Sequence, residues 1–274
     1  MSNGERRGPI SHDRLDQLVD AVLASRKYKS ISQDFIKSLG SQELAKHHTL
    51  KAAIKATKNK LHQVGGAYQD GETYYPSWLI ALRRAPEQEQ LRQACMRIMT
   101  HHASTRERLP LLEQFYTTLL ADLPPVNSVI DIACGLHPLA TPWMPLAEHA
   151  QYYAYDMYRD MTDFLDEFLT IIHLQGHAQA CDVIQSCPTH KVDVAFMLKT
   201  IPCLEQVDRS AGLRLLETIN ADYVIVSFPA HSLGGRKKAM AANYEAHFRE
   251  LVAHKPWAIE RFEFASELVF RIVK

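Results

Sequence analysis

SVIDIACGLHP, residues 128–138, is the stretch that decides the fold. It starts as a short apolar run rich in β-branched residues, 128–133, and turns at once through Gly135. Four similar runs follow at 152–157, 178–183, 192–198 and 222–228, and helical stretches such as 159–173 and 206–219 separate several of them. Strands that alternate with helices predict a parallel sheet with helical crossovers.

The end of the chain adds two more apolar runs, 258–265 and 267–273, which only Ser266 separates. Strands this close along the chain must pair antiparallel, like a hairpin. An α/β sheet finished by such a pair is the usual layout of class I S-adenosylmethionine-dependent methyltransferases. We therefore expect a Rossmann-like, seven-stranded sheet with an antiparallel last strand.

The first hundred residues carry helical periodicity and no strand alternation. Apolar positions repeat at helical spacing in 15–23, 35–39 and 50–61, and we expect the second of these helices to close at Gly40 and the third at Gly65. Pro76 and Pro86 are placed to open two further helices. Ser104 to Glu107 has the spacing of a capping box for the next helix. These patterns predict an all-helical domain over 1–103, followed by the methyltransferase domain over 104–274.

The formal charge of the 274 residues is zero, but the two parts of the chain differ. Residues 1–110 hold 18 Lys and Arg against 11 Asp and Glu, and residues 111–274 hold 13 against 20. The excess is concentrated in 26–60, where Lys51, Lys55 and Lys58 follow one stripe of a helix. Such asymmetry indicates a polyanionic partner, and a merely solvated helix face fits it equally well.

The composition excludes several classes of protein. With 46% hydrophobic and 23% charged residues the chain is globular. No apolar run approaches the roughly 20 residues of a membrane span, and 1–17 has no apolar stretch of a signal peptide. The five cysteines form no CxxC pair, which favours reduced thiols, and the histidines are too scattered for a metal site. We expect a cytoplasmic protein with neither membrane attachment nor metal.

Ligands of open α/β sheets bind beyond the carboxyl ends of the strands, so the residues there are the candidate site. Gly135 would allow close approach to a cofactor. Asp156, 21 residues later, could accept both ribose hydroxyls of an adenosine cofactor, and Asp182, beside Val183, could accept from its adenine amino group. Each acid alone is more often a turn or cap residue, but their joint spacing favours an adenosine cofactor. The GxGxxG fingerprint is absent, which disfavours a pyrophosphate cofactor and a nicotinamide oxidoreductase.

Two further features have a functional and an ordinary interpretation. Arg108 could hold a carboxylate bidentately, or it could be a surface arginine. The segment SFPAHSLGGRKKAMAANY, 227–244, joins two glycines to three cations and then to Asn243 and Tyr244. It could bind phosphates and a base, or it could be an ordinary basic loop.

Six motifs together resemble one family, the aminoglycoside-resistance 16S ribosomal RNA methyltransferases that modify N7 of guanine 1405. They are LHQVGGAY (61–68), HASTRER (102–108), DIACGLHPLA (131–140), MLKTIPCLE (197–205), the segment 227–244 and SELVFRIVK (266–274). The resemblance covers nearly the whole chain. Two residues depart from the family pattern. His137 gives GLHP at 135–138, where family members commonly have GLNP, and Ser266 gives SEL at 266–268, where NEL is common.

The resemblance implies S-adenosylmethionine as cofactor, S-adenosylhomocysteine as product, and 16S rRNA within the 30S subunit as partner. It implies a monomer with no obligate protein partner, whose N-terminal domain of two helical bundles docks on the subunit. The implied cofactor-binding residues are His102, Arg108, Ala133, Gly135, Asp156, Asp182, Val183 and Leu198. Lys199 and Arg236 would serve catalysis, and RNA would contact Lys51, Lys55, Lys58, Lys60, Tyr68, Ser232, Arg236, Lys237, Met240 and Asn243.

Guanine N7 carries a free lone pair and no proton, so this reaction needs no general base. The enzyme's task is to align N7, the methyl carbon and sulfur. Two alternatives stay open: a methyltransferase for another rRNA position, and a non-catalytic ribosome-binding factor that keeps the cofactor fold.

Overall fold

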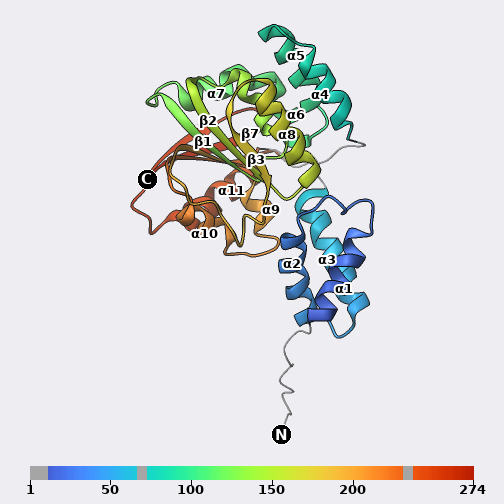
Figure 1. Cartoon of the computed structure of the whole chain (residues 1–274). Helices are drawn as coiled ribbons and strands as arrows, with labels where there is room; N and C mark the ends of the chain where they lie inside the picture. The colour runs from blue at the N-terminus through green and yellow to red at the C-terminus, as the bar shows by residue number, and fades with distance from the viewer. Residues whose placement is uncertain (1–11, 67–72, 231–236) are drawn as a thin grey trace.

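The computed structural model describes residues 12–66, 73–230 and 237–274. The chain begins with α1 (His12–Leu23), α2 (Gln33–Lys46) and α3 (Leu50–Leu61), and a single π-helical turn, η1 (His62–Gly66), continues α3. These helices form a bundle that projects from one end of the sheet domain (Figure 1). Leu18, Ile36 and Leu39 are fully buried in its core, at the positions that the apolar period predicts.

The expectation that α2 closes at Gly40 is wrong, because the helix runs on to Lys46. Gly40 is buried in the contact with α1, and a Cβ atom built on it would lie 2.5 Å from Cδ2 of Leu18. Gly40 therefore allows α1 and α2 to pack closely. The C-cap of α2 is His47 and not Gly40.

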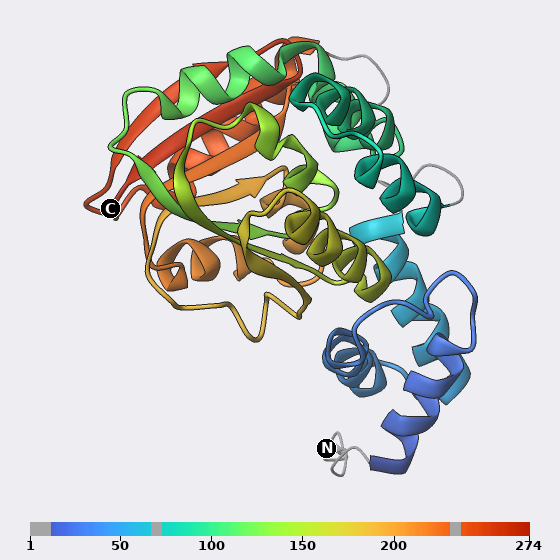
Figure 2. The same cartoon turned by 45° about the horizontal axis from the view of Figure 1, so that its top comes forward.

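Helices α4 (Tyr75–Arg83) and α5 (Gln88–Met99) lie against the sheet domain (Figure 2). Pro76 stands in the first turn of α4, as predicted. The ring of Tyr75 stacks on Phe164 of α8 (Arg159–Ile171), with the ring centroids 5.1 Å apart. The contact fixes α4 against the methyltransferase part of the chain.

The predicted capping box does not form. Helix α6 (Ala103–Arg108) has His102 as N-cap, without a side-chain capping hydrogen bond, and η2 (Leu109–Leu111) and α7 (Leu112–Leu120) follow. The hydroxyl of Thr105 donates to the carbonyl oxygens of Met99 and His102. Glu107 is engaged elsewhere, in an ion pair with Lys199 that is described below.

The sheet has seven strands in the order β3-β2-β1-β4-β5-β7-β6, which confirms the predicted fold class. Strands β1 to β5 are parallel, and β7 runs antiparallel to both β5 and β6. Helices α7 and α8 lie on one side of the sheet and α10 and α11 on the other (Figure 1). The bounds are β1 Val126–Ile132, β2 Leu146–Asp156, β3 Gln175–Ala180, β4 Val192–Leu198, β5 Ala221–Pro229, β6 Ala258–Glu263, β7 Glu267–Val273, η3 His137–Trp143, α9 Ile201–Leu204, α10 Ala211–Thr218 and α11 Lys237–Val252.

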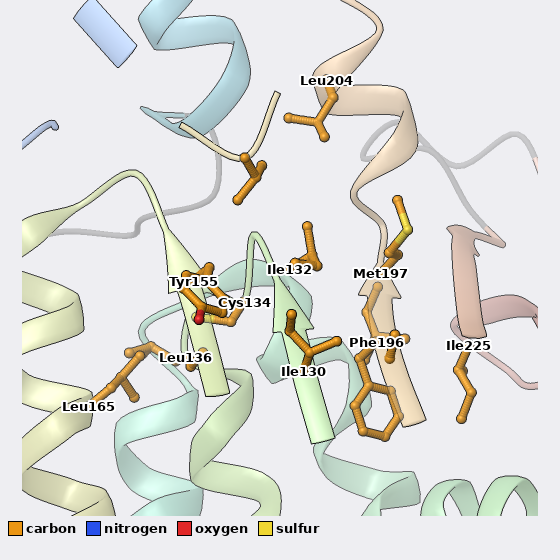
Figure 3. Close-up of a cluster of buried hydrophobic side chains, with 14 of the residues drawn as sticks. Ile130, Ile132, Cys134, Leu136, Tyr155, Leu165, Phe196, Met197, Leu204 and Ile225 are labelled. Carbon is orange, nitrogen blue, oxygen red and sulfur yellow. The ribbon is translucent and has the colours of Figure 1, made fainter. Parts of the chain in front are cut away.

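The core lies around the central strands, where Ile130, Ile132 and Phe196 interdigitate with side chains of neighbouring elements (Figure 3). Helices cover both faces of the sheet, which explains why successive residues at the carboxyl ends of β1 and β4 are buried and do not alternate with exposed ones. The sequence suggested that Asp182 lies at the end of the third strand. Strand β3 instead ends at Ala180, so Asp182 lies two residues beyond it. Within the described residues, no helix has the length and apolar character that a membrane span requires.

Candidate functional site

A pocket opens at the carboxyl ends of β1, β2 and β4 and encloses about 880 Å³, its mouth included. This is the edge at which an open α/β sheet holds its ligand. Of the residues that the sequence proposed for the cofactor or for catalysis, the pocket lining contains His102, Arg108, Ala133, Gly135, Asp156, Val183, Leu198 and Lys199. Asp182 is not among the lining residues, but its neighbours Cys181 and Val183 are.

Three residues at adjacent strand ends adopt left-handed backbone conformations. Gly135 has φ 53°, and the non-glycine residues Ala133 and Lys199 have φ 52° and 57°. Such a conformation costs about 1–3 kcal/mol at a non-glycine position and recurs at functional sites. A Cβ atom on Gly135 would lie 2.8 Å from the ring of His102, so only glycine allows this close packing. The backbone N–H of Lys199 donates to the carbonyl oxygen and hydroxyl of Ser227, which fixes its turn.

Asp156 ends β2 and presents a carboxylate whose orientation the backbone fixes. Its Oδ2 accepts from the N–H of Gly135 at 2.9 Å, and its Oδ1 accepts from Met157 at 2.7 Å and Tyr158 at 3.3 Å. Burial raises the pKa of Asp156 to about 6 in spite of these hydrogen bonds, which favour the charged form. The group is thus ionised at neutral pH and can accept hydrogen bonds from the hydroxyl groups of a ligand.

Asp182 has one satisfied and one unsatisfied carboxylate oxygen. Its Oδ1 accepts from the N–H groups of Ile184 and Gln185, at 3.0 and 3.3 Å. Its Oδ2 is buried and makes no hydrogen bond of normal geometry with any described residue. Burial raises the pKa of Asp182. The hydroxyl of Ser38 lies near this carboxylate, and the buried oxygen keeps acceptor capacity that fits a ligand N–H such as that of an adenine amino group.

Arg108 is fully buried, and the alternative of a surface arginine is wrong. Its Nη2 contacts both carboxylate oxygens of Glu267, at 2.7 and 2.9 Å, and its guanidinium lies over the ring of Phe115. Its Nε and Nη1 make no hydrogen bond of normal geometry with any described residue, and the hydroxyl of Tyr116 lies near the guanidinium. Donor nitrogens left over in a pocket wall are what an incoming carboxylate needs.

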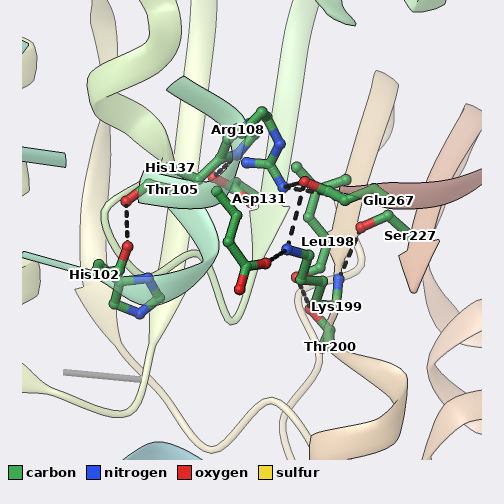
Figure 4. A network of polar contacts seen from close by, with 11 residues as sticks. His102, Thr105, Arg108, Asp131, His137, Leu198, Lys199, Thr200, Ser227 and Glu267 are labelled. Atoms are coloured by element: carbon green, nitrogen blue, oxygen red, sulfur yellow. Dashed lines mark hydrogen bonds and ion pairs between the residues drawn. The ribbon is translucent and has the colours of Figure 1, made fainter. Parts of the chain in front are cut away.

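Lys199 lies between two acids that the sequence did not suggest (Figure 4). Its Nζ is 2.5 Å from Oε2 of Glu107 and 3.7 Å from Oε1 of Glu267. Burial alone would raise the pKa of Glu267, but the charges of Arg108 and Lys199 hold it below its ordinary value. The four residues form one ion cluster at the pocket wall.

The two missed acids both lie within motifs that carry the family resemblance, HASTRER and SELVFRIVK, but neither was assigned to the site. Glu107 has the position of a capping residue, and Glu267 opens a strand. Their partners lie 92 and 159 residues away along the chain, so no short motif could connect them.

His137, the residue that departs from the GLNP pattern, is buried beside the pocket. Its Nδ1 lies 2.7 Å from Oδ2 of Asp131, which also accepts from the hydroxyl of Tyr152 at 2.9 Å. Its ring stacks on Tyr116. His137 therefore forms a polar pair with Asp131, which is a further pocket residue that the sequence did not single out.

The proposed RNA-binding residues fall into three groups. Lys51 and Lys55 are exposed and Lys58 is half-buried, and these three have no ion-pair partner among the described residues. Lys60 pairs with the buried Glu43 at 3.0 Å, which neutralises part of its charge. Met240 is half-buried and Asn243 exposed on α11, while Tyr68, Ser232, Arg236 and the side chain of Lys237 lie outside the described residues.

The sheet order, the antiparallel β7 and a pocket with acids at the ends of β1 and β2 define the class of S-adenosylmethionine-dependent methyltransferases. Residues 24–271 match the family described as "Ribosomal RNA methyltransferase (FmrO)", and the chain belongs to this family.

Similar proteins support the assignment over the full length. A 16S rRNA (guanine(1405)-N(7))-methyltransferase of Micromonospora echinospora is 34% identical, over 96% of this chain and 97% of its own. The protein of the same name from Frankia casuarinae is also 34% identical, with 93% and 92% covered. The crystal structure of the 16S rRNA methyltransferase RmtF, in complex with S-adenosyl-L-homocysteine, superposes with a TM-score of 0.83 at 25% identity, covering 97% of this chain and all of that one.

Proposed function

We propose that this protein transfers a methyl group from S-adenosylmethionine to N7 of guanine 1405 in the 16S rRNA of the 30S subunit. It does so in the cytoplasm, and the modification confers resistance to aminoglycosides. The observation that carries the proposal is the pocket at the strand ends, whose lining contains the guanidinium of Arg108, with two nitrogens that make no hydrogen bond of normal geometry with described residues, and the oriented carboxylate of Asp156. The full-length similarity to relatives named for this reaction supplies the target position.

Each polar end of the cofactor has a proposed partner. Arg108 holds the carboxylate of its methionine moiety through Nε and Nη1, Asp156 accepts from its ribose hydroxyls, and Asp182 accepts from its adenine amino group. The remaining proposed contacts are His102, Ala133, Gly135, Val183 and Leu198. When bound, S-adenosylmethionine supplies an activated methyl group on a sulfonium.

The residues of the chain act by orientation. Guanine N7 needs no deprotonation, so the site can work without a general base. Glu107 and Glu267 hold the ammonium group of Lys199 at the pocket wall, where it can contact the guanine O6 or a phosphate. We assign the same role to Arg236, which lies outside the described residues. A guanine within a helix must leave its stack to reach such a pocket.

Docking is assigned to the helical region that precedes residue 104. Lys51, Lys55 and Lys58 are free to contact phosphates, and Lys60 adds to their field. The segment with Tyr68 and the segment 232–243 complete the proposed RNA surface. We propose that the protein acts as a monomer without an obligate protein partner.

Expression in an aminoglycoside-sensitive bacterium tests the proposal. Resistance to gentamicin and kanamycin with continued sensitivity to apramycin, together with a modification mapped to guanine 1405, is the expected result. If another nucleotide of the rRNA were modified, the proposed target would be wrong, but the protein would still be an rRNA methyltransferase. A protein that binds the 30S subunit but not S-adenosylmethionine would instead be a non-catalytic ribosome-binding factor.

A further inference from the structure

Three residues of the helical bundle line the same pocket as the strand ends. Phe35 comes from α2, and Val64 and Gly65 come from the π-helical turn η1. Phe35 and Val64 are almost fully buried, and both are apolar. The bundle thus supplies part of a wall that the sequence assigned wholly to the methyltransferase domain.

The bundle is hydrogen-bonded to the segment that directly follows Asp156. The N–H of Ser32 donates to the carbonyl oxygen of Met157 at 2.8 Å, and the N–H of Arg159 donates to that of Ser30 at 2.7 Å. Ile31 forms an isolated antiparallel bridge with Tyr158 between these two bonds. The segment that holds Asp156 in place is therefore attached to the start of α2.

Gly65 shows how closely η1 approaches the same segment. A Cβ atom on Gly65 would lie 1.8 Å from Cε of Met157 and 2.7 Å from the hydroxyl of Tyr158. Single π-helical turns within α-helices are frequent at functional sites. Here the turn brings Val64 and Gly65 to the pocket. On α2, the hydroxyl of Ser38 is close enough to Asp182 to lower the pKa of that acid.

We propose that α2 and η1 form the wall of the cofactor pocket at its adenosine end, so that the helical bundle binds the cofactor as well as the ribosome. Phe35 and Val64 offer apolar surface to the purine and ribose between Asp156 and Asp182. A ligand in contact with both parts holds the bundle against the sheet domain. The inference rests on the cofactor of the proposed function and not on the rRNA target.

Calorimetric titration of the full chain with S-adenosylhomocysteine tests the wall directly. Val64→Ala removes two methyl groups from the pocket and should weaken binding by roughly tenfold, and Phe35→Ala, which removes a whole aromatic ring, should weaken it at least as much. Val22→Ala is the matched control for Val64→Ala, because Val22 is fully buried in α1 and does not line the pocket. The control should lower the thermal stability of the bundle and leave the affinity unchanged.

Hydrogen exchange gives a second measurement that needs no variant. Saturation with S-adenosylhomocysteine should slow amide exchange in 30–36 and 62–65, while the outward face of α1 exchanges at an unchanged rate. Unchanged affinity in both Val64→Ala and Phe35→Ala, or an equal loss in Val22→Ala, would overturn the inference. A wild-type chain that fails to bind S-adenosylhomocysteine at all would overturn the proposed cofactor as well, so the two failures are distinguishable.

Discussion

Replacement of Glu267 by glutamine isolates the ion cluster that organises the pocket wall. Glu267 is fully buried and carries the charge that faces Arg108 at 2.7 Å and Lys199 at 3.7 Å. Glutamine keeps the volume and removes the charge. Lys199 keeps Glu107 as a partner, whereas Arg108 has no other carboxylate partner among the described residues. The variant therefore leaves a buried guanidinium unpaired.

The expected loss of stability is large enough to measure. Breaking a buried ion pair by removal of one partner costs about 3–5 kcal/mol. Unfolding entropy of about 2.1 cal/mol/K per residue gives roughly 0.6 kcal/mol/K for a chain of 274 residues. The midpoint of thermal unfolding should then fall by about 5–9 °C. Asp222→Asn is a matched control, because it breaks an ion pair between Asp222 and Lys191 in which both side chains are about half exposed. It should change the midpoint by less than about 2 °C.

Calorimetry at pH 7, with and without S-adenosylhomocysteine, is the assay. Glu267→Gln should also weaken ligand binding, because Arg108 loses the contact that orients it toward the pocket. A midpoint within 2 °C of the wild type, at unchanged ligand affinity, would refute the assignment of this pair as the support of the cofactor carboxylate site. A loss of stability at unchanged affinity would limit Glu267 to a structural role.

Three further predictions address the acid, the docking face and the loop. Because the pKa of Asp156 is about 6 and only the ionised form accepts from ribose hydroxyls, the affinity for S-adenosylhomocysteine should be constant above pH 7 and fall by up to tenfold per unit below pH 6. Titrations from pH 5 to 8 check this, and a flat profile contradicts it. Changing Lys51, Lys55 and Lys58 together to glutamine should weaken 30S binding and reduce its logarithmic salt slope by about 2–3, whereas an unchanged slope would mean that the stripe is only a solvated face. Arg236→Glu should abolish modification of 16S rRNA at unchanged cofactor affinity, and loss of cofactor binding would contradict its assignment to the RNA side.

The strands were predictable where burial makes the pattern simple. Strand β4 covers 192–198 as predicted, and β1 and β5 begin within two residues of the prediction. Strand β3, QGHAQA, lies at an edge of the sheet and is half exposed, so it lacks a continuous apolar run. The apolar residues that follow it shifted the prediction three residues toward the C-terminus.

Local rules failed where a distant contact decides the structure. Gly40 satisfies the rule for a helix end, but the approach of Leu18 determines its place. Glu107 satisfies the rule for a capping box, but the ammonium of Lys199 is the stronger partner for its carboxylate. Sequence spacing reports only neighbours along the chain, and the family resemblance identified Arg108 and Lys199 as site residues but did not assign a role to the acids that hold them.

The opposite charges of the two parts of the chain correspond to opposite charges in their ligands. Lys46 and Lys60 both pair with Glu43, so the field of the bundle rests mainly on cations that have no acidic partner within the described part of the chain, such as Lys51 and Lys55. Those cations suit a polyanion. The pocket has the reverse balance, because acids in and beside it outnumber Arg108 and Lys199. The sulfonium of S-adenosylmethionine is a cation, and it loses this charge when the methyl group leaves. We therefore expect an acidic pocket to favour the methyl donor over the spent product, through the acids that are not paired with Arg108 or Lys199, which are Asp131, Asp156 and Asp182.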